Sequence, residues 1–142
     1  ILDGMSVRVG GDVFIIPLGY ISESLQPTAD AIKSLAGGQH VVAVRGDYLP
    51  VLSLAQAFNA RAEVERYEQG ILVILESEGA KTALFVDGLV GQHQVVIKSL
   101  ETNYRKVAGV SGATIMGDGR VAMILDVAHL VGLANSRLGK AA

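Results

Sequence analysis

The sequence has 142 residues but contains no cysteine, no tryptophan and only three prolines. The lack of cysteine excludes disulfides and thiolate zinc sites. The formal net charge is −2. The chain therefore lacks the excess of basic residues that is typical of nucleic-acid binding and of polybasic membrane contacts. The longest strictly apolar run, Gly70 to Leu75, is too short to cross a bilayer. We therefore expect neither nucleic-acid binding nor direct insertion into a membrane.

The N-terminus carries no visible targeting signal. The chain begins with Ile1 instead of methionine and has no signal peptide, so we expect it to be a fragment of a longer protein. The absence of cysteine fits a cytoplasmic protein without proving one, because many exported proteins also lack it. Glycine, in contrast, is abundant with 17 residues, and this predicts many tight turns.

Short β-branched runs separated by glycine are the main pattern, and they predict an all-β fold with short helices. Gly10-Gly11 and Gly117-Asp118-Gly119 predict hairpin turns, and Pro17 predicts a strand end because proline lacks the N–H of the ladder. The expected strands are 6–9, 12–16, 20–25, 41–44, 48–52, 70–76, 82–86, 89–90, 95–97, 113–116 and 120–125.

Two short helices are expected after good N-cap residues, Ser53 and Asp126, whose side-chain oxygens can accept from free first-turn N–H groups. One should cover about 54–58 and the other about 126–135. Residues 27–35 fit either a short helix or an irregular loop. Residues 59–69 form the most polar stretch and are the best candidate for a link between two halves.

The two halves also resemble each other weakly. Residues 14–21 resemble 83–90, about 69 residues on, and residues 50–54 resemble 123–127, about 73 residues on. Such a repeat implies two similar small barrels, each ending in a helix. The length fits either this arrangement or one ordinary domain.

No catalytic or metal-binding group stands out. His40, His93 and His129 lack the i, i+4 spacing of a zinc-binding helix, so we expect surface or half-buried histidines. For Asp87 and Asp126, next to strand ends, turn or cap roles are expected. The basic and aromatic cluster Tyr104-Arg105-Lys106 is most simply an exposed loop. We therefore expect no catalytic residue, no metal and no cofactor.

Leu35 and Tyr48 both stand at turns, where burial is harder to arrange. Exposed aliphatic and aromatic side chains at turns are common anchors of protein interfaces. The equally simple alternative is that each side chain folds back over its own barrel.

Long motifs across the chain closely resemble the C-terminal regulatory domain of chemotaxis histidine kinases of the CheA type. The similarity fades only in 59–69 and after about Leu133. The matching stretches are 1–7, 23–27, 44–50, 95–107, 109–111 and 113–122.

This resemblance implies a CheW-like fold of two tandem five-stranded SH3-like barrels, which we assign to residues 1–65 and to residues 66–142 with the C-terminal helix. It implies a non-catalytic domain that docks the kinase to the coupling protein CheW and to the cytoplasmic tip of chemoreceptors, in arrays on the inner face of the membrane. The rest of the kinase chain is a further expected partner. By position, Leu35 and Tyr48, with the neighbouring Leu49, match the contact with the coupling protein. Ile21 and Glu23 match a strand with coupling or receptor contacts.

Two alternatives remain. A stand-alone CheW-type adaptor would have the same fold. A small β-barrel hydrolase or metal enzyme would need a convergent polar site, which the sequence does not display.

Overall fold

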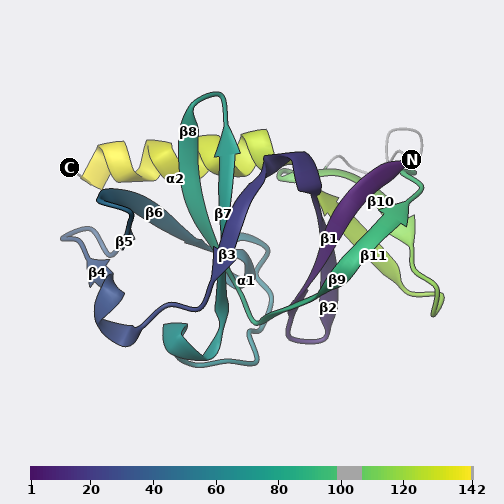
Figure 1. Ribbon diagram of the computed structural model, residues 1–142, viewed down its shortest axis with the longest axis horizontal. Coiled ribbons are helices and arrows are strands. Elements are labelled where there is room, and N and C mark those ends of the chain that lie inside the picture. The colour runs from purple at the N-terminus through teal and green to yellow at the C-terminus, as the bar shows by residue number, and fades with distance from the viewer. Residues whose placement is uncertain (99–106, 142) are drawn as a thin grey trace.

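The computed structural model describes residues 1–98 and 107–141, which form two β-sheets side by side and one long helix (Figure 1). The strands are β1 (Leu2–Val9), β2 (Asp12–Pro17), β3 (Ile21–Leu25), β4 (Ile32–Ser34), β5 (His40–Val44), β6 (Asp47–Ser53), β7 (Ile71–Ser77), β8 (Ala80–Val86), β9 (Gly88–Val95), β10 (Val110–Ile115) and β11 (Val121–Leu125). The helices are α1 (Leu54–Ala57), α2 (Val127–Ala141) and one-turn 3₁₀ helices at Leu18–Tyr20, Ala29–Ala31 and Tyr67–Gln69.

The first sheet has five strands in the order β10-β11-β2-β1-β9. Because it is built from both ends of the chain, we call it the terminal barrel. It closes where Lys98 and Ala113 exchange two backbone hydrogen bonds, at 2.8 and 3.0 Å, so that the chain beyond β9 meets β10. β2 ends at Pro17, as expected for a residue that cannot donate to the ladder.

The second sheet has six strands in the order β3-β7-β8-β6-β5-β4, and we call it the central barrel. Its sixth strand, β4, arises from the ambiguous stretch 27–35, which forms a 3₁₀ turn followed by this short edge strand. The expected class, an all-β fold with two SH3-like barrels, is thus confirmed, with one additional edge strand in the central barrel.

The barrels do not divide the chain at residue 65, so the boundary that we drew there needs correction. Residues 1–65 and 66–142 are the two halves of the repeat: β1 and β2 correspond to β7 and β8, and β3 corresponds to β9. The corresponding strands are exchanged, because β3 pairs with β7 and β9 pairs with β1. Each barrel therefore contains strands from both halves, and the chain crosses between barrels after β2 and after β8.

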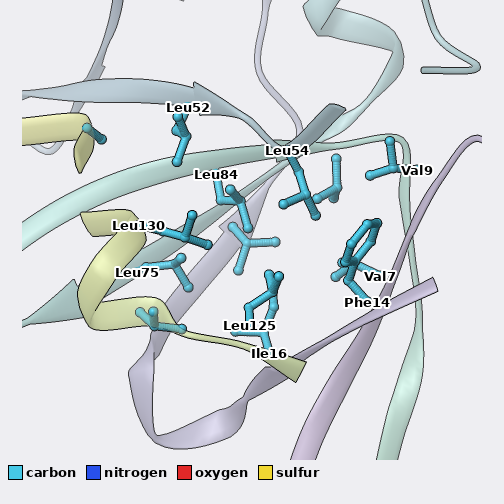
Figure 2. Packing of buried hydrophobic residues seen from close by; sticks show 14 of the residues in the cluster. Val7, Val9, Phe14, Ile16, Leu52, Leu54, Leu75, Leu84, Leu125 and Leu130 are labelled. Atoms are coloured by element: carbon cyan, nitrogen blue, oxygen red, sulfur yellow. The ribbon is translucent and has the colours of Figure 1, made fainter. Parts of the chain in front are cut away.

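The largest hydrophobic cluster lies between the barrels instead of inside either one. Figure 2 shows Val7, Phe14 and Ile16 from the terminal barrel meeting Leu84 from the central barrel and Leu130 from α2. Each barrel interior holds a smaller cluster of its own. Burial of apolar surface at this shared cluster joins the two barrels into one packed unit.

The two α-helices begin where the sequence predicts. Ser53 and Asp126 are their N-caps, and each side chain accepts a hydrogen bond from a first-turn backbone N–H. α2 continues about six residues beyond its expected end and packs against β6, β7 and β8 (Figure 1). Among the described residues, no helix combines the length and the apolar character needed to span a bilayer.

Candidate docking surfaces

The most exposed aromatic side chain of the described residues belongs to Tyr48, at the start of β6. Its relative exposure is 63%, and it pairs across the hairpin with the exposed Ala43 of β5. The connecting turn is tight, with positive φ at Arg45 (51°) and Gly46 (87°), as in two-residue hairpins of type I′. This turn gives the hairpin a defined end, so the Tyr48 ring is presented on a rigid support. We call Ala43 and Tyr48 the central hairpin face.

Glu23 of β3 contacts the same turn. Its two carboxylate oxygens accept from Nε and Nη2 of Arg45 at 3.1 and 3.0 Å, a bidentate ion pair. These hydrogen bonds, followed by the charge of Arg45, hold the pKa of the Glu23 carboxyl below its ordinary value. Glu23 therefore fastens β3 to the turn that carries Tyr48.

Leu35 lies at the other end of β5 from Tyr48. It is half-buried in the β4–β5 connection, where its N–H donates to the carbonyl of Gln39 at 2.7 Å. Leu35 and Tyr48 lie on opposite sides of the five-residue strand β5 and are about 13 Å apart along its axis, at about 3.3 Å per residue. A typical interface buries about 800 Å² per partner, a disc about 30 Å across, so one partner can cover both positions.

Of the five predicted contact residues, Tyr48 is exposed, Leu49 is buried, and Leu35, Ile21 and Glu23 are half-buried. Leu49 is only 7% exposed and packs in the interior of the central barrel with Val42 and Phe85. Leu49 points inward because successive strand residues alternate in direction and Tyr48 points outward. Its expected contact with the coupling protein stays a prediction. Ile21 is half-buried and packs against the cluster between the barrels.

A second exposed apolar pair, which we did not predict, lies on the terminal barrel. Ile115 of β10 and Val121 of β11 pair directly across their hairpin and are 56% and 60% exposed. They stand where the repeat places Ala43 and Tyr48, and we call them the terminal hairpin face. The weak repeat was the signal that could have identified them. The Gly117-Asp118-Gly119 turn between them is architectural, as expected, with φ +86° at Gly119.

The histidines are separate from one another. The His40 ring packs 5.5 Å from the ring of Tyr67, and His129 lies on α2. Nε2 of His93 lies 2.9 Å from Oγ of Ser6, whose hydroxyl donates to the carbonyl of Gly91. Ser6 is completely buried, so this serine is not placed to attack a substrate. Within 1–98 and 107–141, no three His, Asp or Glu side chains gather as a metal site. The Tyr104-Arg105-Lys106 cluster lies outside the described residues.

The fold is thus a pair of interlocked SH3-like barrels, each with an exposed apolar hairpin face. The chain belongs to the CheW-like domain family, whose model matches residues 3–135. It is 57% identical over 133 residues to the chemotaxis protein CheA of Salmonella typhimurium, and the alignment covers 94% of this chain and 20% of that protein. It is 53% identical over 142 residues to CheA of Klebsiella aerogenes, with 100% and 22% of the two chains covered.

The chain spans about a fifth of the length of these curated relatives. Among solved structures, the scaffolding protein TtCheW of Thermoanaerobacter tengcongensis superposes with a TM-score of 0.73 over 88% of each chain. The identity to TtCheW is 16%, so this likeness establishes the fold alone. The sequence matches in turn identify the relatives as chemotaxis proteins, in agreement with the resemblance noted in the sequence.

Proposed function

We propose that this chain is the non-catalytic regulatory domain of a chemotaxis histidine kinase. It docks the kinase to the coupling protein CheW and to the cytoplasmic tips of chemoreceptors. The proposal places it in the cytoplasm, at receptor arrays on the inner face of the membrane. The sequence similarity to CheA proteins over almost the whole chain supports the kinase assignment.

The observation that carries the docking role is the exposed Tyr48 on a rigid hairpin. An aromatic ring at 63% exposure contributes little to the fold, and tyrosine is among the residues that most often dominate binding energy. The ion pair between Glu23 and Arg45 keeps the hairpin end in place before a partner arrives. Preorganisation of this kind lowers the entropy cost of binding.

The terminal hairpin face supports a second contact. Ile115 and Val121 present apolar side chains at the position equivalent to the central hairpin face. A domain with two docking faces on opposite barrels can hold two partners at once, and repeated contacts of this kind build chains or rings. A CheW molecule, which has the same two-barrel fold, is a suitable partner for each face.

Chemoreceptor contact is proposed along β3, where Ile21 and Glu23 lie. β3 is an edge strand of the central barrel and also the strand by which the chain passes from one barrel to the other. A receptor that shifts β3 therefore acts on both barrels together, and the docked domain can move as a body relative to the rest of the kinase.

The test is a titration of CheW into the parent chain and into the Tyr48→Ala and Leu35→Ala variants by calorimetry. We expect Tyr48→Ala to weaken binding at least tenfold, about 1.4 kcal/mol, and Leu35→Ala to weaken it less. Tyr20→Ala is the matched control, because Tyr20 is 38% exposed but lies on a 3₁₀ turn away from both hairpin faces. Unchanged affinity for both test variants would sink the proposed contact on the central barrel.

The stand-alone adaptor alternative shares the fold of TtCheW, but its support is weaker. The identity to TtCheW is 16%, whereas the identity to CheA of Salmonella typhimurium is 57%. The reading frame of the parent gene distinguishes the two: a preceding ATP-binding domain supports the kinase, and its absence supports the adaptor.

A further inference from the structure

Asp87, at the crossover between β8 and β9, is the only Asp or Glu buried beyond nine-tenths among the described residues, with 5% exposure. One oxygen, Oδ2, accepts from the backbone N–H of Gly10 at 2.6 Å and of Glu63 at 2.8 Å. The other oxygen, Oδ1, accepts from the N–H of Val64 at 3.4 Å. A buried carboxylate with such partners is costly to disturb, because each lost bond leaves a buried polar group unsatisfied.

These three donors belong to two segments that are distant in sequence. Gly10 is in the β1–β2 turn of the terminal barrel, whereas Glu63 and Val64 belong to the polar link that follows α1. The two segments also touch directly, since a Cβ on Gly10 would overlap the carbonyl oxygen of Arg61. An ion pair between Arg8 and Glu63 lies beside them. Asp87 thus joins both halves of the repeat at the point where the chain passes from one barrel to the other.

The β1–β2 turn held by Asp87 leads on to the terminal hairpin face. The guanidinium of Arg120 donates to the carbonyl oxygen of Gly11, and Arg120 is adjacent to Val121. Two hydrogen bonds, Gly10 to Asp87 and Arg120 to Gly11, joined by the Gly10–Gly11 backbone, therefore connect Asp87 with the β10–β11 hairpin. Rigid connected groups of this kind can transmit a displacement between distant sites.

The other crossover has no such arrangement. Between β2 and β3 the chain forms the 3₁₀ turn Leu18–Tyr20, in which no residue is buried. The repeat places the hydrophobic Leu18 near the position of Asp87, about 69 residues apart. Of the two connections between the barrels, the one after β8 therefore contains the buried, hydrogen-bonded carboxylate.

We infer that Asp87 is a positioning residue that sets the orientation of the terminal hairpin face relative to the central hairpin face. The inference rests on the proposed function, in which the two faces bind separate partners. A chain or ring of domains closes only if each domain presents its two faces at a fixed angle. Asp87 contributes to neither face, so its loss should spare single contacts and disturb assembly.

The first measurement requires no partner. Because the chain lacks cysteine, spin labels can be attached at Lys33→Cys in the central barrel and Gln94→Cys in the terminal barrel, both exposed positions. We expect one narrow distance distribution in the parent chain and a broadened or displaced one in Asp87→Ala. Asp126→Ala is the matched control: it also removes a carboxylate that accepts from a backbone N–H, but at the start of α2, and it should keep the parent distribution.

The second measurement adds CheW and compares complex sizes by analytical ultracentrifugation. Parent and Asp126→Ala chains should form species larger than one-to-one, whereas Asp87→Ala should bind CheW mostly one-to-one. Asp87→Asn keeps an oxygen for Gly10 and Glu63 and should restore both the distance and the larger species. In that variant, hydrogen exchange should quicken at Val64 but not at Gly10 or Glu63, which tests the inference even if Asp87→Ala does not fold.

The outcomes separate the two proposals. A parent chain that does not bind CheW contradicts the proposed function, while the distance measurement still tests Asp87. A distance distribution in Asp87→Ala that matches the parent overturns the inference, whatever CheW does. The inference is equally overturned if Asp87→Asn shows faster exchange at Gly10 and Glu63 than at Val64.

Discussion

Ser53 and Asp126 occupy equivalent positions in the two halves of the chain. Oγ of Ser53 accepts from the N–H of Gln56 at 3.3 Å, and Oδ1 of Asp126 accepts from the N–H of His129 at 3.2 Å. In each half, the cap lies at the end of a strand that pairs in parallel with its neighbour: β6, paired with β8, ends at Ser53, and β11, paired with β2, ends just before Asp126. The shared cap is the clearest local trace of the repeat.

Replacing either cap by alanine should destabilise the domain. We expect Ser53→Ala and Asp126→Ala each to lower the free energy of unfolding by about 1 kcal/mol, since each removes a partner of a first-turn N–H. Denaturant unfolding followed by circular dichroism measures this. Ser53→Thr keeps a hydroxyl acceptor and should lose much less. Equal losses in Ser53→Ala and Ser53→Thr would contradict a capping role.

Gly10→Ala should destabilise the domain far more than Gly11→Ala. Gly10 has φ +58°, and an added Cβ would overlap the Arg61 carbonyl oxygen, whereas a Cβ on Gly11 meets nothing within 4 Å. We expect a loss of about 1–3 kcal/mol for Gly10→Ala and a change within about 0.5 kcal/mol for Gly11→Ala. Thermal unfolding of the two variants side by side checks the difference. Similar melting temperatures would show that the link does not pack on this turn.

Leu84→Ala should weaken both barrels at once. Leu84 is fully buried in the cluster between them, so we expect a loss of about 2–5 kcal/mol. Scanning calorimetry should still show one transition, at lower temperature, because the barrels share this core. Val121→Ala, at a site 60% exposed, is the control and should change stability by less than about 0.5 kcal/mol. Two separated transitions in Leu84→Ala would mean that the barrels unfold independently.

The ion pair between Glu23 and Arg45 should respond to acid. Since Arg45 lowers the pKa of the Glu23 carboxyl in the folded chain, the unfolded state binds more protons between the lowered and the ordinary pKa. The pair therefore stabilises the fold above the ordinary carboxyl pKa, and this contribution is lost as the pH falls through the lowered value. Arg45→Gln should raise the Glu23 pKa in an NMR titration. Lys81→Gln should change it little, because Lys81 is the smallest of the contributing causes. No rise in Arg45→Gln would contradict this account.

Local features were predictable because their causes are local. The caps at Ser53 and Asp126, the end of β2 at Pro17 and the turn at Gly117-Asp118-Gly119 each depend on a few neighbouring residues. The outward position of Tyr48 also implies the inward position of Leu49 by simple alternation, so the burial of Leu49 could have been predicted.

The exchange of β3 and β9 was not predictable in this way, because the choice of partner strand depends on contacts between residues distant in sequence, such as Ile21 with Leu75 and Leu2 with Val95. The sequence alignment of the two halves of the repeat also differs by one residue from the structural correspondence. The sequences align Phe14 with Ala83, but in the structure Phe14 and Leu84 face the cluster between the barrels. A shift of one residue reverses the faces of a strand, and low sequence similarity cannot resolve it. Asp87 was expected in a turn role, but its distant donors, Gly10, Glu63 and Val64, emerge only from the tertiary structure.

The exchange of strands also orders the events of synthesis. The central barrel uses strands from residues 21–86 alone, so all its strands are synthesised before β10. The β1–β2 hairpin, made first, must wait for β9 and β11 with its strand edges unpaired. Unpaired edges invite wrong partners, and early closure of the central barrel limits the chain that remains exposed. Within the domain, the central barrel therefore has all its strands available before the terminal barrel, which pairs the earliest strands with the latest ones.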